Sequence, residues 1–190
     1  MSRWPDGAAE RLHAAAMELF AEQGFAATTV PQIAQRAGLT TRSFFRWYPD
    51  KREVLFTGED ELPDVVAAMF ASAPSELSPM DCIRRGFRDV VSARFERLRP
   101  ELLARWHVIR TDEGLLERQS RKLAILHEAS VRGFRFRGLA PLEADLAARL
   151  AVTVFDAAAA RWLERDDAVF ADVADEVCSE LSAVVRGGQG

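Results

Sequence analysis

The apolar residues of this 190-residue chain recur at helical spacing from one end to the other. Between residues 8 and 23 they lie three or four positions apart, which is the spacing of one face of an α-helix. The members of this face are Leu12, Ala15, Ala16, Leu19 and Phe20. Gly24 predicts the end of the helix, because glycine accepts the left-handed backbone of a helix C-terminus. No stretch alternates apolar and polar residues as a half-buried β-strand does.

Two short helices with a tight turn between them follow. A threonine at 28 or 29 caps the first, with Pro31 tolerated in its first turn. Gly38 provides the turn, and the next helix opens at Thr40 or Thr41 and runs to Tyr48. This is the pattern of a helix-turn-helix, whose second helix lies in the major groove of DNA and reads base edges with its N-terminal residues.

The fourth helical stretch is interrupted. Asp50 caps a helix that begins at Lys51, but Gly58 and Pro63 disfavour a continuous helix. The sequence therefore predicts a break near residues 57–63 and a short helix that ends near Phe70. Ala73 to Ser75 reads as a connector.

The rest of the chain is predicted to be helical throughout. Ser78 caps a helix that we expect to break at Arg99-Pro100, with a further helix of about three turns reaching Ile109. Three more helices are expected over 112–138, over 141–162, and from Asp166 or Asp167 to residue 184. The fold class is thus all-α with about nine helices. The expected divisions are a DNA-binding domain over 8–56, a connecting segment over 57–77 and a C-terminal domain over 78–186.

Charge is sorted by region. The formal net charge is −4, yet residues 35–52 carry five basic side chains and one acidic one. Phosphate contact acts within a Debye length of about 10 Å, so an acidic chain with a basic segment can bind DNA. Residues 78–140 carry 14 basic and 8 acidic side chains, and residues 141–190 carry 4 and 10. This basic middle region fits an anionic ligand, and it equally fits pairing with the acidic last two helices.

The sequence offers no pattern for catalysis or metal binding. Cys82 and Cys178 lie in apolar helical patterns and are expected to be buried, reduced thiols. His13, His107 and His127 lack metal-ligand spacing, and no nucleophile motif or carboxylate pair occurs. We expect no enzyme activity, no cofactor and no metal. Without a signal peptide or an apolar run of ~18–20 residues, we expect a cytoplasmic protein with no membrane contact.

The helix-turn-helix resembles that of the TetR family of one-component transcriptional regulators, which are mostly bacterial repressors. The matching residues are Thr29-Val30, Ile33-Ala34, Ala37-Gly38-Leu39-Thr40, Ser43-Phe44-Phe45, Trp47-Tyr48 and Lys51. Residues 44–49 look like a subset found largely in actinobacteria, some of which are similar to regulators that respond to acyl-coenzyme A. The resemblance implies an N-terminal three-helix DNA-binding domain and a C-terminal helical domain that binds a small ligand and dimerises.

Candidate DNA contacts follow from residue type and position. Arg42 is the expected base reader, because arginine pairs with two acceptors of guanine. Thr41 and Ser43 flank it, Lys51 is expected to neutralise a phosphate, and Arg46 is open between phosphate and solvent. Thr29 is either a phosphate contact or a helix cap. Relative to the family pattern, Phe45 replaces a common tyrosine and so cannot donate an O–H to a phosphate. The indole N–H of Trp47 can donate to the phosphate instead. Phe44 and Tyr48 are expected in the core.

Candidates in the C-terminal domain rest on apolar stripes. An effector cavity is expected to be lined by Phe87, Val90, Arg94, Phe95, Trp106, Leu123, Leu126 and Phe155. The same stripes would equally build a filled core. Arg94 lies beside an apolar face and needs either an internal carboxylate or an anionic ligand. A dimer interface in the last two helices is expected to use Leu146, Leu150, Val154, Ala158, Trp162, Val173, Val177 and Leu181.

The sequence therefore predicts a homodimeric repressor that leaves a palindromic operator in double-stranded DNA when an effector binds. The expected effector is small and hydrophobic, and an anionic one such as an acyl-coenzyme A fits the basic middle region. The alternatives are a DNA-binding regulator with a filled C-terminal core and no effector, and a helical enzyme that keeps the helix-turn-helix as a scaffold. How an effector moves the DNA-reading helices depends on the predicted break near Gly58 and Pro63.

Overall fold

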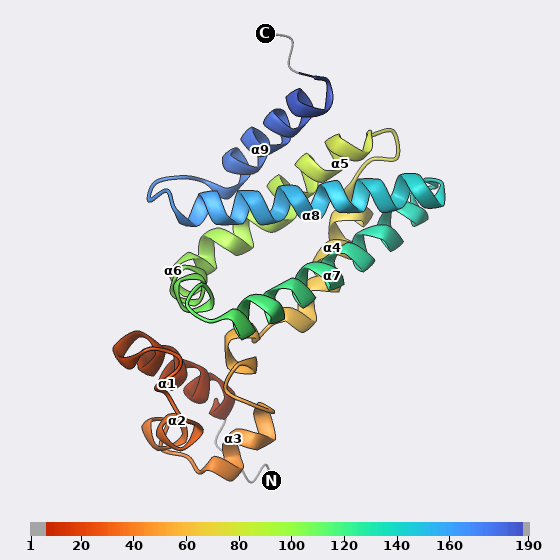
Figure 1. Cartoon of the computed structure of the whole chain (residues 1–190). Coiled ribbons are helices and arrows are strands. Elements are labelled where there is room, and N and C mark those ends of the chain that lie inside the picture. The colour runs from red at the N-terminus through yellow and green to blue at the C-terminus, as the bar shows by residue number, and fades with distance from the viewer. Residues whose placement is uncertain (1–6, 188–190) are drawn as a thin grey trace. The chain divides into compact units, whose positions relative to one another are not determined.

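The computed structural model describes residues 7–187, and these contain helices and turns but no strand (Figure 1). The all-α prediction is confirmed. The helices of this part of the chain are α1 (Ala8–Gln23), α2 (Val30–Arg36), α3 (Thr41–Trp47), α4 (Leu62–Ser72), α5 (Pro79–Gly86), α6 (Ser92–Ile109), α7 (Glu113–Phe136), α8 (Pro141–Leu163) and α9 (Phe170–Val185). The short 3₁₀ helices are η1 (Glu53–Phe56) and η2 (Glu59–Glu61), and η3 (Phe87–Val91) is a π-helical segment between α5 and α6.

The chain forms two compact units. The first combines Met1–Asp60 with Leu103–Gln119, and we call it the head unit. The second combines Glu61–Leu102 with Ser120–Gly190, and we call it the body unit. The head unit therefore includes the end of α6 and the start of α7 as well as the N-terminal helices.

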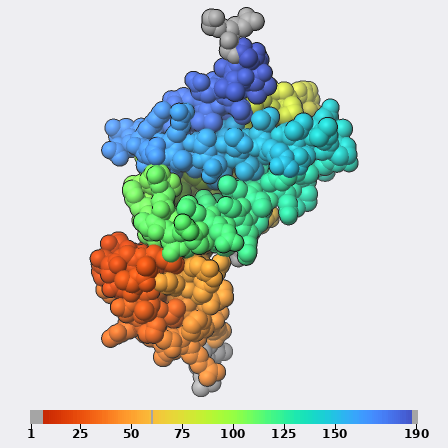
Figure 2. All heavy atoms as spheres, viewed as in Figure 1, coloured from red at the N-terminus to blue at the C-terminus, as the bar shows by residue number. Residues whose placement is uncertain are grey.

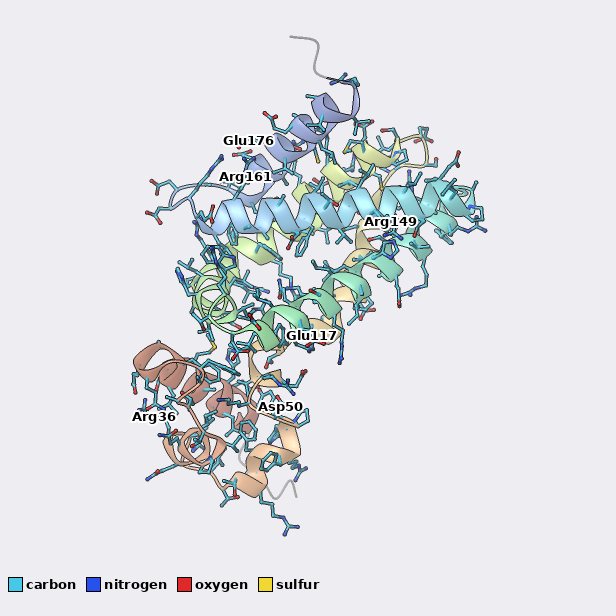
Figure 3. All side chains as sticks on the ribbon, viewed as in Figure 1. Arg36, Asp50, Glu117, Arg149, Arg161 and Glu176 are labelled. Atoms are coloured by element: carbon cyan, nitrogen blue, oxygen red, sulfur yellow. The ribbon has the colours of Figure 1, made fainter. Side chains whose placement is uncertain are left out.

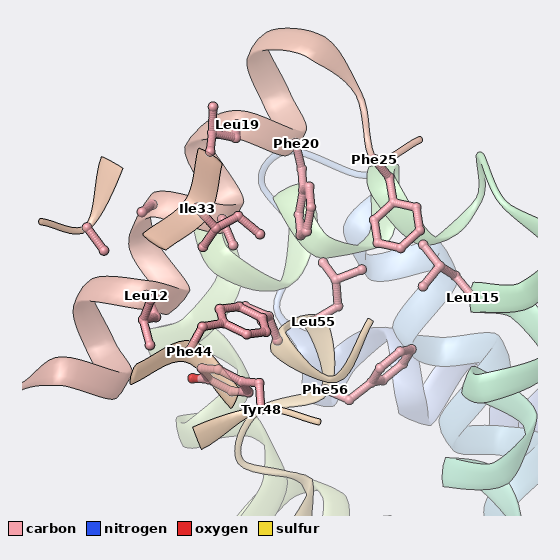
Figure 4. Close-up of a cluster of buried hydrophobic side chains, with 14 of the residues drawn as sticks. Leu12, Leu19, Phe20, Phe25, Ile33, Phe44, Tyr48, Leu55, Phe56 and Leu115 are labelled. Carbon is pink, nitrogen blue, oxygen red and sulfur yellow. The ribbon is translucent and has the colours of Figure 1, made fainter. Parts of the chain in front are cut away.

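The core of the head unit is a cluster of buried apolar side chains from α1, α2, α3 and η1 (Figure 4). Leu12, Ile33 and Phe44 have no exposed surface, as the helical spacing of their segments requires. Ile109 at the end of α6 and Leu115 at the start of α7 belong to the same cluster. The core around α1, α2 and α3 is therefore completed by residues far away in the sequence.

The turn between α2 and α3 depends on Gly38. Its φ is +64°, in the left-handed region that side chains disfavour. A Cβ at this position would also lie 2.9 Å from Nη2 of Arg11, whose guanidinium donates to the carbonyl of Ala37. Glycine at position 38 thus lets α1 clamp the turn.

The predicted break after the DNA-reading helices is present. Asp50 accepts hydrogen bonds from the backbone N–H of Arg52 at 2.7 Å and of Glu53 at 3.2 Å, but what it caps is the four-residue η1 and not a long helix. Gly58 follows with φ of +81°, and α4 begins only at Leu62 with Pro63 in its first turn. The entry into α4 is thus a series of short turns.

The predicted break at Pro100 is wrong. Helix α6 continues through Pro100, although proline removes one backbone hydrogen bond and costs a helix interior about 3 kcal/mol. The neighbouring Arg99 anchors the helix, because its guanidinium donates to the carbonyls of Trp162 (2.9 Å), Arg165 and Ala168 (3.1 Å) and lies 4.7 Å from the ring centroid of Trp162. Tertiary contacts therefore override the local preference.

Helices α8 and α9 pack against each other in the body unit (Figure 1). Helix α9 begins at Phe170, a few residues later than predicted, because Ala168 is held in the preceding turn by hydrogen bonds from Arg99 and from the indole N–H of Trp162. The buried rings of Trp162 and Phe170 are 5.8 Å apart at their centroids. Phe95 lies against both rings, so one aromatic cluster joins α6, α8 and α9.

Helix α4 lies unusually close to its neighbours in the body unit. A Cβ on Gly133 of α7 would fall 2.1 Å from the ring of Phe70, and one on Gly86 of α5 would fall 2.5 Å from the end of Met69. The ring of Phe70 also meets that of Phe134 edge-on at 4.7 Å. Two glycines therefore create the notches into which α4 packs.

Candidate DNA-reading helix and ligand cavity

Helix α3 divides cleanly into an inner and an outer face. Phe44 and the following Tyr48 are buried in the head core. The outer face presents the exposed side chains of the helix, which are Thr41, Arg42, Phe45, Arg46 and Trp47. An exposed helix that begins with a threonine and an arginine has the layout of a recognition helix.

Arg42 differs from the other cations of residues 35–52. Arg36 donates to Glu22 at 2.7 and 2.8 Å and to Glu18 at 3.2 Å, which pins α2 to α1 (Figure 3). Arg52 pairs with Asp50 at 2.9 Å. Arg42 is exposed and has no hydrogen bond, ion pair or ring contact with any residue between 7 and 187. As far as residues 7–187 are concerned, all the donors of its guanidinium are therefore available for a partner outside the chain.

Lys51 has a different position from the one predicted. Its ammonium donates to the backbone carbonyls of Phe25 (2.7 Å), Thr28 (2.8 Å) and Ala26 (3.4 Å), and it lies 4.3 Å from the ring centroid of Phe25. Burial lowers the pKa of this ammonium, while Asp112 acts in the opposite direction. Three acceptors use its three N–H groups. Lys51 thus closes the turn between α1 and α2, and we withdraw it as a phosphate contact.

Two large aromatic side chains are exposed on α3. Phe45 is 57% exposed and its ring meets Phe44 edge-on at 5.5 Å, while Trp47 is 47% exposed. The guanidinium carbon of Arg46 lies 6.0 Å from the centroid of the Trp47 ring. Exposed aromatic surface on a DNA-reading helix is suited to contact with thymine methyl groups and with the sugar-phosphate backbone.

Two of the predicted polar contacts take part in helix caps, Thr29 as the N-cap of α2 and Ser43 as the partner of the N-cap Thr40 of α3. The hydroxyl of Thr29 donates to Oε1 of Gln32 at 2.9 Å, and the same oxygen accepts the backbone N–H of Thr29 at 2.8 Å. Ser43 is buried, with its backbone N–H 3.1 Å and its hydroxyl 3.0 Å from the hydroxyl of Thr40. The prediction that Ser43 is presented to DNA is therefore wrong, because its side chain closes the first turn of α3. Thr29 is exposed and Thr41 is exposed.

Two arginines, one near the end of α6 and one near the start of α7, hold the head unit together through contacts that the sequence did not predict. Arg118 pairs with Glu53 and Glu59, and Arg105 donates to the carbonyl of Leu55 at 3.0 Å. These partners lie 50 to 65 positions apart along the chain. The one local hint is that Ile109 and Leu115 flank the turn, since apolar residues beside a turn need something to cover them.

The body unit contains an apolar cavity. Counting the space at its mouth, about 670 Å³ is free of atoms, but the centre of a water molecule fits in only about 50 Å³ of it. The cavity is therefore a narrow slot between α4, α5, η3, α6, α7 and α8. Its lining is Leu62, Val65, Val66, Met69, Phe70, Cys82, Ile83, Phe87, Val91, Arg94, Phe95, Leu126, Ser130, Ala151, Val152 and Phe155.

Some of the predicted effector contacts line this cavity and others do not. Those that do are Phe87, Arg94, Phe95, Leu126 and Phe155. Val90 and Leu123 are half-buried but do not line it. Trp106 belongs to the head unit, where its ring carries the guanidinium of Arg110 at 4.4 Å. Helical periodicity predicts which face of a helix is buried but not which part of that face borders a cavity. The lining residues from α4 were missed for another reason, because the sequence analysis assigned this helix to the connecting segment.

The sequence left two partners open for Arg94, an internal carboxylate or an anionic ligand. In the structure its partner is an internal carboxylate, that of Glu61. Nη2 of Arg94 lies 2.6 Å from Oε2 of Glu61. The Arg94 side chain is 29% exposed and that of Glu61 is 62% exposed. Glu61 is the residue directly before α4. The pair thus ties the cavity wall to the start of that helix.

Part of the basic middle region pairs with the acidic last helix. Arg84 donates to the carbonyl of Asp175 and the hydroxyl of Ser179, both at 3.2 Å, and its guanidinium lies 3.6 Å from the Asp175 carboxylate. Arg88 also pairs with Asp175. For these arginines of α5 and η3, internal pairing explains the charge, and an anionic ligand is not required.

Five of the eight predicted dimer contacts are corrected by the structure. Val154, Ala158, Trp162, Val173 and Val177 are buried within the chain itself, so they have almost no surface to offer a partner. Leu146 is exposed, and Leu150 and Leu181 are half-buried. Other apolar side chains are exposed on the same two helices, namely Leu142, Val184 and Val185.

Between residues 7 and 187, no three or more His, Cys, Asp or Glu side chains gather closely enough to hold a metal ion. In that same range, every helix is too short or too polar to cross a membrane.

Comparisons with known proteins place both parts of the chain. Residues 12–57 match the family described as bacterial regulatory proteins, tetR family. The HTH-type transcriptional regulator TcmR of Streptomyces glaucescens is 29% identical over 147 residues, which are 75% of this chain and 65% of TcmR. The chain thus spans less than two thirds of the length of that relative.

Solved structures with the same fold cover almost the whole chain. A putative TetR-family transcriptional regulator from Syntrophomonas wolfei superimposes with a TM-score of 0.64 at 13% identity, over 95% of this chain and 96% of that one. FadR of Thermus thermophilus, a TetR-family transcriptional repressor in complex with lauroyl-CoA, gives 0.55 at 24% identity, over 96% and 95%. At these identities the likeness shows the fold alone.

Proposed function

We propose that the chain is a regulator of the TetR family, whose family description its residues 12–57 match, and that it is a sequence-specific DNA-binding regulator of transcription. It acts as a repressor that a small-molecule effector releases from a palindromic operator. The match of residues 12–57 and the likeness to TcmR support a regulator and not an enzyme. The observation that carries the proposal is the outer face of α3, where Arg42 is exposed and has no partner between residues 7 and 187.

The proposed DNA contacts are those that the outer face of α3 offers. Arg42 reads a guanine with two hydrogen bonds, and Thr41 contacts a base or a phosphate beside it. Phe45 lies against thymine methyl groups, while Arg46 and Trp47 contact the backbone. Thr29 adds a phosphate contact at the start of α2. Ser43 and Lys51 position these groups from within the head unit and do not contact DNA.

Two copies are proposed to pair through α8 and α9, which form one continuous surface on the face shown in Figure 2. Exposed Leu142, Leu146 and Val184 supply apolar contacts, and Arg161 and Glu176 lie on these helices as a charged rim (Figure 3). A four-helix interface of this kind is isologous and closes a two-fold dimer. It would present two recognition helices to successive major grooves about 34–36 Å apart.

The proposed effector site is the cavity of the body unit. Its lining is almost wholly apolar with few polar groups, as in most small-molecule sites. The FadR named above has the same fold and is in complex with lauroyl-CoA, which supports a ligand with a slender acyl chain. The narrow interior favours a second candidate, a DNA-binding regulator whose body core is filled and takes no effector.

The experiment that tests the proposal selects DNA from a random-sequence pool with the full chain. The expected result is an enriched two-fold symmetric site whose half-sites lie one helical turn apart. Recovery of no preferred sequence would contradict it. Adding lauroyl-CoA or other small acyl compounds to the selected complex then separates the two candidates, because only an effector-responsive protein releases the DNA.

A further inference from the structure

The contact between Arg94 and Glu61 suggests how an effector would be recognised. Resting on the proposed function, we propose that the effector is an amphiphile with a slender apolar chain and an anionic head group, and that its head group replaces Glu61 as the partner of Arg94. The chain would occupy the apolar slot and the head group would lie where the Glu61 carboxylate now is.

The charges around the cavity favour an anion. Among the residues that line it in the described chain, Arg94 is the one that carries a charge, and no carboxylate lines it. A second cation lies close by, because Nζ of Lys122 is 5.9 Å from the ring centroid of Phe155, which lines the cavity. Lys122 is only 6% exposed. Arg94 is thus the cation of the lining itself, and Lys122 lies behind the Phe155 ring and has an interaction of its own within the chain.

Glu61 is a partner that can be displaced. Its carboxylate is 62% exposed, and ion pairs with water-exposed carboxylates contribute little net stability because water and salt screen them. An anion carried into the mouth of the cavity by an apolar chain loses more of its water and so interacts more strongly with the same guanidinium. The exchange at Arg94 itself therefore needs only a carboxylate or phosphate that is better placed than Glu61.

The cavity is too narrow for the proposed ligand, so its binding would change the structure of the body unit. The interior of the cavity, about 50 Å³, is large enough for a few water molecules but not for a long acyl chain. A ligand must therefore push a wall outward. The π-helical η3 supplies Phe87 and Val91 to this wall, and π-helical segments are frequent at functional sites.

Helix α4 is the wall that we expect the ligand to displace. Met69 and Phe70 fill the notches at Gly86 and Gly133, so a chain that enters the slot competes with this packing. Glu61 directly precedes α4 and is the first residue of the body unit. Release of Glu61 from Arg94 therefore frees the start of the helix at the same time as the ligand displaces its middle.

The test is calorimetric titration of the full chain with laurate and lauroyl-CoA, each below its critical micelle concentration, and with methyl laurate below its solubility limit. The carboxylate and the CoA phosphates are the two sources of the anion, and methyl laurate is the neutral control. The wild type is expected to bind at least one anionic probe roughly tenfold more tightly than methyl laurate. The anionic probe that binds more tightly identifies the head group.

Two variants decide whether the exchange occurs. Arg94→Ala should bring the anionic and neutral probes to within about threefold of each other. Glu61→Gln should tighten the anionic probe by about two- to fivefold and leave methyl laurate unchanged, because it removes the competing carboxylate but keeps the shape. Arg97→Ala and Asp64→Asn, exposed neighbours with no contact to the pair, are the matched controls.

The outcomes are separable. Weaker or unchanged anion binding by Glu61→Gln overturns the exchange, and it does so even if Arg94→Ala fails to fold. Equal binding of methyl laurate and the anionic probes, or no binding of any probe, overturns the proposed ligand class. DNA selection with the same wild-type preparation tests the proposed function independently, since operator binding requires no effector.

Discussion

Arg118 of α7 and Glu53 of η1 form a two-point ion pair, with Nε 2.8 Å from Oε1 and Nη2 3.0 Å from Oε2. The remaining guanidinium nitrogen, Nη1, lies 3.0 Å from Oε2 of Glu59, and the guanidinium carbon is 4.4 Å from the ring centroid of Phe56. One side chain from the middle of the sequence therefore holds both short helices that lead from the DNA-reading helices to α4. The break in the fourth helix is compensated by this contact.

Replacing Arg118 with alanine is expected to destabilise the head unit by about 1–3 kcal/mol, because Glu59 is only 7% exposed and would lose a charged hydrogen-bond partner. The measurement is urea unfolding of the full chain. Arg121→Ala, an exposed position one turn along α7, is the matched control. Equal unfolding midpoints for Arg118→Ala and the wild type would show that the ion pair does not hold the head.

Replacing Gly133 with alanine should destabilise the body unit by about 1–3 kcal/mol, since the new Cβ would lie 2.1 Å from the ring of Phe70. The sign of the change in unfolding free energy is informative, because replacing glycine with alanine inside a helix otherwise stabilises a protein by about 1 kcal/mol. Thermal unfolding measures the change, with Arg132→Ala at the adjacent exposed position as control. A raised melting temperature would mean that α4 does not pack against α7 as described.

The two thiols are expected to be unreactive in the folded protein. Burial raises the pKa of Cys82, with Arg137 opposing, and burial raises the pKa of Cys178, with Arg84 opposing. Both thiols therefore stay protonated and covered near pH 8, and labelling with a chromogenic disulfide should be slow until the chain is unfolded in guanidinium. Prompt labelling of either thiol in the native protein would contradict their burial.

The same pKa shifts give a pH dependence of stability. The folded state holds these protons more tightly than the unfolded state does, so their contribution is fully present below a pKa of about 8.5, that of a free thiol, and is lost as the pH rises above it. Unfolding free energies measured between pH 7 and pH 10 should fall across this window. Replacing both cysteines with serine should reduce that fall.

The helical periodicity of the chain was enough to predict most of the fold. The apolar faces of α1, α7, α8 and α9, the glycine turn at Gly38 and the break near Gly58 are local features, and local rules predict them. Pro100 is the instructive failure, because the contacts of Arg99 that keep α6 continuous join it to residues more than sixty positions away.

The sequence predicted those site residues whose exposure follows from helical periodicity alone. Arg42 and Phe45 fall on the outer face of α3 once Phe44 and Tyr48 are recognised as core. The inward orientation of Ser43 and the three carbonyl partners of Lys51 depend on how the caps and turns close. The pairing of Arg94 with Glu61 was open for the same reason, since a sequence shows that an arginine needs a partner but not which one it has.

The most direct test of the central claim, that α3 reads DNA through Arg42, is fluorescence anisotropy with the operator obtained by selection. Arg42→Ala should lose about 1–3 kcal/mol of binding free energy at that operator and relax the preference at one base pair of each half-site, whereas the surface control Arg132→Ala should bind as the wild type does. Unchanged affinity of Arg42→Ala for the selected operator, with unchanged base preference, would contradict the account.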